Sequence, residues 1–309
     1  MAQDERTLNM DLPAAVAFAA REGNVDAVRE WLANGGAPDA ITTKGYTMLI
    51  YACNSYRPSC AVVAEILCEA GARGQGLCLG FAAMYGAVHT VRVLLRYGAP
   101  ASATLSNGTT ALHQTVLAND WSRLVDPWSR AHAQAAAFIG HQGVVRLLLK
   151  HGAAVNAPSP NKHVTPLMNA ARFSGFISLG LVRELLRGGA DLDSVDTKGR
   201  NAEAFARLQL QSPIYTGEGI AEHPKECRRP GAVEAFLELC AEVRAAGSWK
   251  RYVNAPRIDV IVLQRLCAAG RASPPPALLR LFPTSTKSPP LPREMVWLIL
   301  KFWRTDRDP

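Results

Sequence analysis

Apolar positions recur with helical spacing through the first two thirds of the chain, and residues 136–156 show the pattern most clearly. This stretch, AAFIGHQGVVRLLLKHGAAVN, begins with two alanines, turns at Gly140 and continues into an apolar run from Val144 to Leu149. Gly152 then ends the run, as glycine does after many helices. The pattern predicts the end of one helix, a tight turn and a second helix with one apolar side. A hairpin this small cannot bury that side alone, so it requires neighbours of the same kind.

The same helix-ending glycine signal occurs five times along the chain. Each predicted second helix is followed by a Gly-Ala pair, and paired small residues mark the first helix upstream. The uneven spacing indicates that the third unit is shortened and that the fourth carries an insertion. A repeated two-helix unit predicts a solenoid with one continuous core. The Gly-Ala pairs begin at Gly36, Gly71, Gly98, Gly152 and Gly189.

Several units open with a threonine placed to cap the first helix. Thr47, Thr110 and Thr165 hold this position, and Thr110-Ala-Leu-His and Thr165-Pro-Leu-Met are the fullest versions of the motif. The chain here resembles the ankyrin-repeat family, whose first helix opens with Thr-Pro-Leu-His and whose period is about 33 residues. The resemblance covers roughly Asp11 to Leu208. It implies an all-α ankyrin-repeat solenoid of about five to six helix-turn-helix repeats with short finger loops, followed by a C-terminal helical extension.

The domain organisation follows from where this pattern stops. We predict a repeat array over residues 1–210 with an insertion near residues 119–130, and a loop over residues 211–231. A helical tail is expected over residues 232–309, containing a proline-rich linker at residues 273–291. At the other end of the array, Asp11 is expected to cap the first helix, with Pro13 in its first turn.

Composition and charge narrow the class of protein. Hydrophobic residues make up 48% of the 309 residues, yet no run reaches the roughly 18 to 20 apolar residues of a membrane helix. Seven cysteines occur without a C-x-x-C motif, which is typical of reduced thiols. We therefore expect a cytoplasmic protein, with the nucleus left open, and no membrane partner.

The net charge of +8 belongs entirely to the C-terminal tail. Residues 1–243 hold 22 lysines and arginines against 22 acidic residues, whereas residues 244–309 hold 12 against 4. The basic residues of the tail are spread singly among apolar ones, so nucleic-acid binding is not expected.

The chain offers no catalytic, cofactor or metal motif. Asp191, Asp193 and Asp196 lack the glycine and glutamate of a calcium loop, so they are expected to carry charge into solvent from the finger region. His113 and His141 stand where the resemblance implies structural histidines that bond to neighbouring backbone. We predict a protein that is not an enzyme and has no cofactor.

The resemblance implies a binding surface for another, unidentified protein. In the ankyrin family, the finger tips and the turn after the paired small residues line a concave groove and contact the partner. The alternative is that neighbouring fingers already cover these side chains. Carried over onto this chain, the predicted partner-binding residues are Thr43, Lys44, Tyr46, Asn107, Lys162, Lys198 and Arg200 on the fingers, and Met84, Tyr85, Phe138, Ile139, Arg172 and Phe173 at the helix ends.

The tail allows a second function. Leu263 and Cys267 match the Leu-x-x-x-Cys of a suppressor-of-cytokine-signalling box, and Leu291 with Pro292 resembles the opening of an F-box. Either resemblance implies recruitment of ubiquitin-ligase subunits, so that the protein would be a substrate adaptor. The alternative is that the last helix only caps the solenoid.

Overall fold

The computed structural model describes residues 9–55, 57–117, 141–172, 179–210 and 231–268. The chain divides after Leu237 into two compact units. The repeats lie in the first unit.

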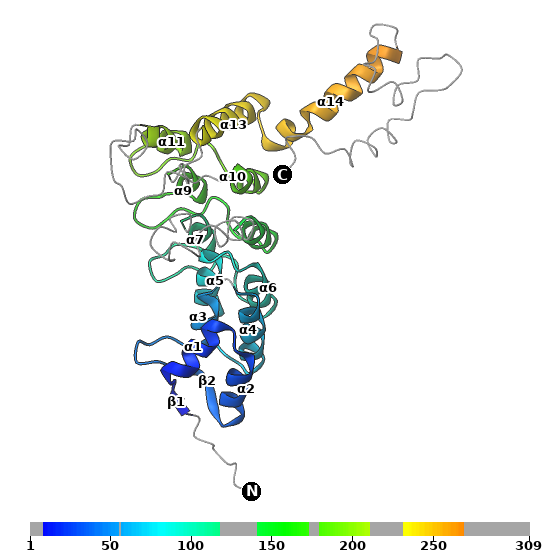
Figure 1. The fold of residues 1–309 in the computed structure, drawn as a ribbon. Helices are drawn as coiled ribbons and strands as arrows, with labels where there is room; N and C mark the ends of the chain where they lie inside the picture. Colours follow the sequence, from blue (N-terminus) through cyan, green and yellow to red (C-terminus); the bar gives the residue numbers. More distant parts are fainter. Residues whose placement is uncertain (1–8, 56, 118–140, 173–178, 211–230, 269–309) are drawn as a thin grey trace, which may run out of the picture. The chain divides into compact units, whose positions relative to one another are not determined.

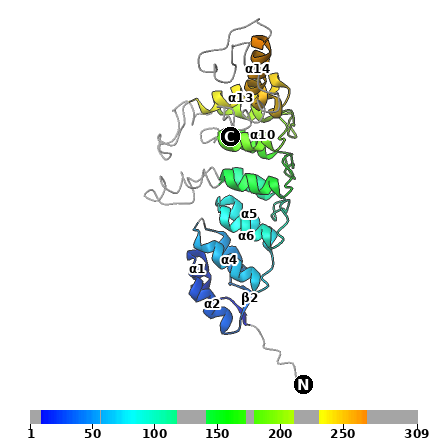
Figure 2. The same cartoon turned by 90° about the vertical axis from the view of Figure 1, so that its right-hand side faces the viewer.

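Two columns of helices build the first unit (Figure 1). The first helices of successive repeats contact one another in chain order, and the second helices stack beside them, with α2 against α4 and α4 against α6. Figure 2 turns this second column toward the reader. The first helices are α1 (Ala14–Glu22), α3 (Met48–Cys53), α5 (Gln75–Met84), α7 (Ala111–Leu117), α9 (Pro166–Arg172) and α11 (Ala202–Leu210); the second helices are α2 (Val25–Ala33), α4 (Ser59–Glu69), α6 (Val88–Arg96), residues 141–150 and α10 (Leu179–Arg187).

The core is built from apolar side chains of both columns, and each regular repeat contributes an equivalent leucine from its first helix. Leu49, Leu112 and Leu167 each lie two residues after a capping threonine, and all three are completely buried. Small residues such as Ala52 and Ala171 are also fully buried, which lets neighbouring helices approach closely. Burial of equivalent positions in successive repeats produces the continuous core that the sequence predicts.

The predicted threonine caps are confirmed at three helix starts. In α3, α7 and α9 the threonine side chain accepts a hydrogen bond from the backbone N–H three residues later, at 3.4 Å in each case. Asn201 does the same for Ala204 at 2.9 Å. Each bond satisfies a backbone donor that the first turn of a helix leaves free.

The start of the array differs from the prediction. Asp11 does not cap α1: it ends the strand β1 (Asn9–Asp11), which pairs in parallel with β2 (Gly36–Ile41). Pro13 precedes α1 instead, without a side-chain cap. The pairing continues through the Leu12 N–H, which donates to the Ile41 carbonyl at 2.9 Å, while the Leu12 side chain is buried. Backbone pairing and burial of Leu12 therefore set the path of this segment.

The third and fourth repeats, which are irregular in sequence, still contain a first and a second helix. In the third repeat α5 begins directly after Gly74, so this repeat has no finger. In the fourth repeat α7 and residues 141–150 form the two helices, and the predicted insertion lies outside the described residues. The loop predicted at residues 211–231 also lies outside them, apart from Gly231.

Within the part of the chain that the structure describes, two helices follow the array. Helix α13 (Ala232–Ala246) spans the division between the units, and α14 (Trp249–Ala268) belongs to the second unit and contains Pro256. The proline-rich linker and the helix predicted after it lie outside the described residues. In the part of the chain that the structure describes, no helix has the length and apolar character needed to cross a membrane.

Candidate partner-binding surface

Four finger loops join repeats among the described residues, and each is a short hairpin closed by a backbone hydrogen bond. The residue at each turn has a left-handed backbone, a conformation that glycine adopts without strain. Glycine holds this position in three fingers, whereas His163 holds it in the third, with φ of 50°. The closing bonds run from Thr42 N to Tyr46 O (3.0 Å), Leu105 N to Thr109 O (2.8 Å), Ser159 N to Val164 O (2.9 Å) and Asp196 N to Arg200 O (2.9 Å).

The last three fingers contact one another. A Cβ atom at Gly108 would lie only 2.2 Å from Cγ of Pro160, so the second finger packs against the third. The Thr197 N–H donates to the Lys162 carbonyl at 3.1 Å, which ties the fourth finger to the third. We call residues 42–46, 105–109, 159–164 and 196–200 together the finger row. Its loops project to the left of the first helices in Figure 1.

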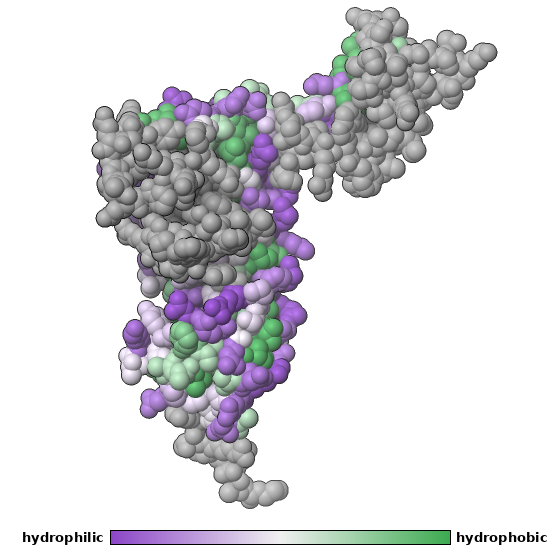
Figure 3. Space-filling model, viewed as in Figure 1, coloured by the Kyte–Doolittle hydropathy of each residue, from purple (hydrophilic) through white to green (hydrophobic). Residues whose placement is uncertain are grey.

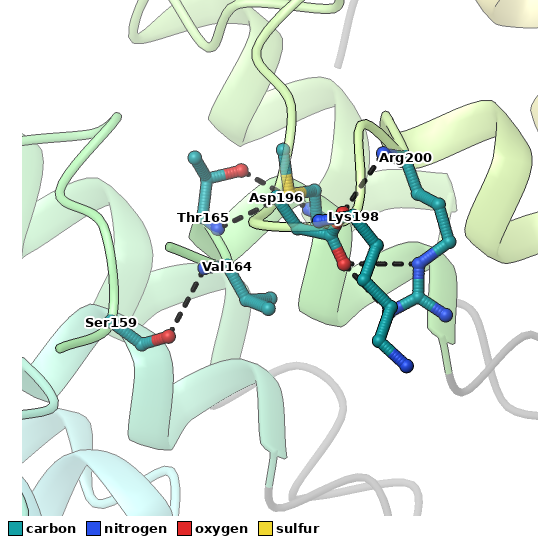
Figure 4. Close-up of polar contacts among 7 residues, drawn as sticks. Ser159, Val164, Thr165, Asp196, Lys198 and Arg200 are labelled. Atoms are coloured by element: carbon teal, nitrogen blue, oxygen red, sulfur yellow. Dashed lines mark hydrogen bonds and ion pairs between the residues drawn. The ribbon is translucent and has the colours of Figure 1, made fainter. Parts of the chain in front are cut away.

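The fourth finger is held by Asp196 (Figure 4). One carboxylate oxygen accepts the backbone N–H groups of Lys198 and Arg200 at 2.9 and 2.8 Å, and the other accepts Nε and Nη2 of Arg200 at 3.0 and 2.6 Å. These bonds lower the pKa of Asp196 to about 2, the Arg200 side chain being the largest cause. The expectation that Asp196 carries charge into solvent is therefore wrong: its side chain is buried and neutralised within the finger.

Two buried histidines tie repeats together, as the sequence predicts. His113 Nδ1 bonds with the Thr110 hydroxyl at 2.8 Å, and His113 Nε2 lies 2.9 Å from the Val164 carbonyl of the third finger. His141 Nε2 lies 3.0 Å from the carbonyl of Met84. Burial lowers the pKa of His113, against a smaller opposing effect of the bond to Val164. His113 therefore supports the finger row from beneath.

Most predicted finger residues lie on the surface. Thr43, Lys44, Asn107, Lys162 and Lys198 are all exposed. Tyr46 is 44% exposed, and its ring meets that of Tyr51 edge-on with centroids 6.3 Å apart. Arg200 differs, because its guanidinium binds Asp196 and lies 4.5 Å from the ring centre of Phe205.

The predicted helix-end residues are less uniform. Arg172 is exposed at the end of α9, whereas Met84 and Tyr85 are half-buried at the end of α5. Burial raises the pKa of the Tyr85 hydroxyl, and the charge of Arg21 partly opposes that rise. Arg21, in the last turn of α1, therefore lies near Tyr85. Phe138, Ile139 and Phe173 lie outside the described residues.

Phe18 is an exposed aromatic residue that is absent from the predicted contact residues. Its side chain is 57% exposed on α1, beside the exposed Ala14 and Ala15. Hydrophobic residues cover α1 in the lower part of Figure 3. Phe18 stands in FAAREG where Phe81 stands in FAAMYG, and Phe81 is half-buried in α5. The motif therefore marks the position but not the exposure, which depends on the neighbours of each helix.

Three buried cysteines, Cys53, Cys60 and Cys68, are not activated nucleophiles. Burial is the main cause that raises the pKa of each of these thiols, that of Cys68 to about 11. These three thiols therefore stay protonated at neutral pH. Among the described residues, no group of three or more His, Cys, Asp or Glu side chains is placed to hold a metal ion.

Of the tail residues, Leu263 and Cys267 lie one turn apart on α14, and both are half-buried. Leu291 and Pro292 lie outside the described residues.

Two columns of helices, capped in the same way and joined by hydrogen-bonded fingers, define a helical repeat solenoid. Sequence comparison identifies the kind of repeat. A family model of three ankyrin repeats matches residues 16–104, and a model of one ankyrin repeat matches residues 107–160, so this part of the chain consists of ankyrin repeats. The same caps and fingers continue beyond it through α9 and α11. No curated protein matches the chain significantly. Ankyrin repeats are generally protein–protein interaction modules.

Proposed function

We propose that the array is a non-enzymatic scaffold that holds a partner polypeptide on the finger row and the adjoining ends of the first helices. The supporting observation is that hydrogen bonds hold the base of each finger while the tip is exposed. A backbone bond closes every finger, His113 also supports the third, and Asp196 supports the fourth. The exposed tip residues include Lys44, Asn107 and Lys198. A surface ordered before binding loses less entropy when a partner docks.

Exposed aromatic side chains supply apolar anchors for such a partner. Tyr46 lies on the first finger and Phe18 on α1, which contacts α3 directly behind that finger. Tyrosine and other aromatic residues contribute strongly to binding when a partner covers them. Tyr46 is supported edge-on by Tyr51, which limits the freedom that it would lose on binding.

The test is partner capture by the full chain carrying Phe18→Ala together with Tyr46→Ala. The matched control is Val62→Ala, which removes an apolar side chain that is 43% exposed on α4, in the other column of helices. We expect the double variant to lose captured protein, the control to retain it, and both to melt within a few degrees of the wild type. Equal capture by all three proteins would refute the proposed surface. A large fall in melting temperature would assign the aromatic residues to the core.

Adaptor function for a ubiquitin ligase stays a prediction from the sequence. Half of the residues behind it, Leu291 and Pro292, lie outside the described residues. Removal of residues 291–309 tests it: an adaptor would lose a ligase subunit and keep its partner, whereas a capping helix would leave the set of captured proteins unchanged.

A further inference from the structure

The lysines of the finger row occupy equivalent positions. Lys44, Lys162 and Lys198 each directly precede the residue whose left-handed backbone forms the turn. All three are exposed, and none of the ion pairs among the described residues involves them. The remaining finger has the neutral Asn107 at this position. One structural site is thus cationic in three of four fingers.

Within the four fingers, acidic side chains do not balance these lysines. The four fingers contain three lysines, one arginine and a single carboxylate, Asp196, which is buried and paired with that arginine. Other carboxylates of the array form ion pairs outside the finger row, as Glu65 does with Arg96 and Glu184 with Arg146. The sequence of residues 1–243 is balanced in charge, so the excess positive charge of the finger row arises from where the fold places its charges.

From this charge pattern we propose that the partner is an acidic polypeptide segment, whose carboxylates bind the finger-tip lysines while its apolar side chains contact Tyr46 and Phe18. The inference rests on the proposed function and adds the chemistry of the partner. Complementary charge favours encounter with such a segment and disfavours basic ones. A protein is favoured over nucleic acid because three spaced lysines fall short of the about six to ten phosphate contacts of a typical duplex site.

The test uses a fluorescein-labelled peptide in which glutamate alternates with leucine and tyrosine, and an otherwise identical peptide with glutamine for glutamate. Fluorescence anisotropy measures binding to the full chain at low and at high sodium chloride. We expect the glutamate peptide to bind, to weaken as salt rises, and to bind more tightly than the glutamine peptide. No binding of the glutamate peptide at low salt would overturn the proposal.

Two triple variants test whether the acidic peptide binds the finger-tip lysines or basic residues elsewhere on the array. Lys44→Gln with Lys162→Gln and Lys198→Gln should weaken binding of the glutamate peptide roughly fivefold to twentyfold, given the modest contribution of each exposed pair. Arg29→Gln with Arg92→Gln and Lys150→Gln removes the same charge from exposed positions on the second helices and should leave affinity within about twofold. Equal losses in both variants would show that only net charge matters and overturn the proposal.

Further measurements distinguish a failure of this inference from a failure of the proposed scaffold function. If Phe18→Ala with Tyr46→Ala abolishes binding of both peptides while the lysine variant changes nothing, the surface binds polypeptide without selecting acidic ones, and only the inference fails. If neither variant affects binding, both fail. A labelled single-stranded oligonucleotide that binds more tightly than the glutamate peptide, through the same lysines, would also overturn the proposal in favour of nucleic acid.

Discussion

His113 Nε2 lies 2.9 Å from the carbonyl oxygen of Val164, which follows it by 51 residues in the chain. A carbonyl only accepts, so this nitrogen carries the proton and Nδ1 accepts from the Thr110 hydroxyl. The same carbonyl also closes the third finger by accepting from Ser159 N. One neutral side chain therefore joins α7 to the finger of the following repeat.

Replacement of His113 by leucine should destabilise the array by about 1–3 kcal/mol at pH 7.5, since buried polar groups of Thr110 and Val164 would lose a partner. Urea unfolding followed by circular dichroism measures the change. His89→Gln, at an exposed position, is the control and should cost less than about 0.5 kcal/mol. A cost for His113→Leu as small as that of the control would contradict the role of this bond.

The same histidine should make stability depend on pH. Its pKa in the folded chain is lowered from 6.5, chiefly by burial, so the folded state favours the neutral ring. Its stabilising contribution is complete above pH 6.5 and is lost as the pH falls below 6.5 toward the folded pKa, because the unfolded chain binds the proton first. The difference in unfolding free energy between wild type and His113→Leu should therefore shrink between pH 7.5 and pH 5.5. A constant difference would indicate that His113 titrates alike in both states.

Gly108 and Gly45 allow the packing of fingers to be separated from backbone strain. Both have left-handed φ, near 73° and 75°, but a Cβ at Gly45 meets no atom within 4 Å, whereas one at Gly108 meets Pro160. Gly45→Ala should cost about 1–2 kcal/mol from strain alone. Gly108→Ala should cost at least about 1 kcal/mol more, because the two fingers must separate. Equal costs in urea unfolding would show that contact between these fingers adds nothing.

Asp196→Asn should loosen the fourth finger locally. Loss of the buried carboxylate removes charge-assisted bonds, each typically worth about 1.5–3 kcal/mol, and should speed hydrogen exchange at the amides of Lys198 and Arg200. The depressed pKa, about 2 against 3.8, means that this contribution is complete above pH 3.8 and is lost as pH falls toward 2. Asp191→Asn is the control, since Asp191 also accepts a backbone bond but is exposed. Similar rates of amide hydrogen exchange in both variants would show that Asp196 does not hold the fourth finger in place.

The sequence predicted those features that depend on local pattern. Threonine caps, apolar periodicity and turn glycines are each encoded within a few residues, so helices and most fingers follow from them. The pairing of β1 with β2 joins segments some 25 residues apart, and no local pattern signals it. Asp11 consequently received a capping role that it does not have.

Within the candidate site, the sequence predicted which positions lie on the fingers better than it predicted the exposure and the hydrogen-bond partners of their side chains. Asp196 and Asp191 look alike in sequence, but only the first is surrounded by N–H groups and a guanidinium after folding. Phe18 and Phe81 share a motif, and only their neighbours make the first exposed and the second half-buried. Arg200 pairs with Asp196 only four residues away, but this pair depends on the closed conformation of the finger, which residue type alone does not predict.

A substitution at Met168 can test whether the contact made by His113 can be introduced into the following repeat. It occupies the equivalent position three residues after a capping threonine, and its sulfur lies 3.5 Å from Thr165 N. Met168→His should place an imidazole between the Thr165 hydroxyl and the Arg200 carbonyl, the counterpart of Val164 in the fourth finger. We expect a gain of about 0.5–1.5 kcal/mol at pH 7.5, which diminishes toward pH 5.5 because the new ring must be neutral. Met168→Leu controls for the loss of the thioether in this fully packed site. If the histidine variant is the less stable of the two in urea unfolding, the fourth finger does not present its carbonyl as the third does, and the repeats are less equivalent than their shared caps indicate.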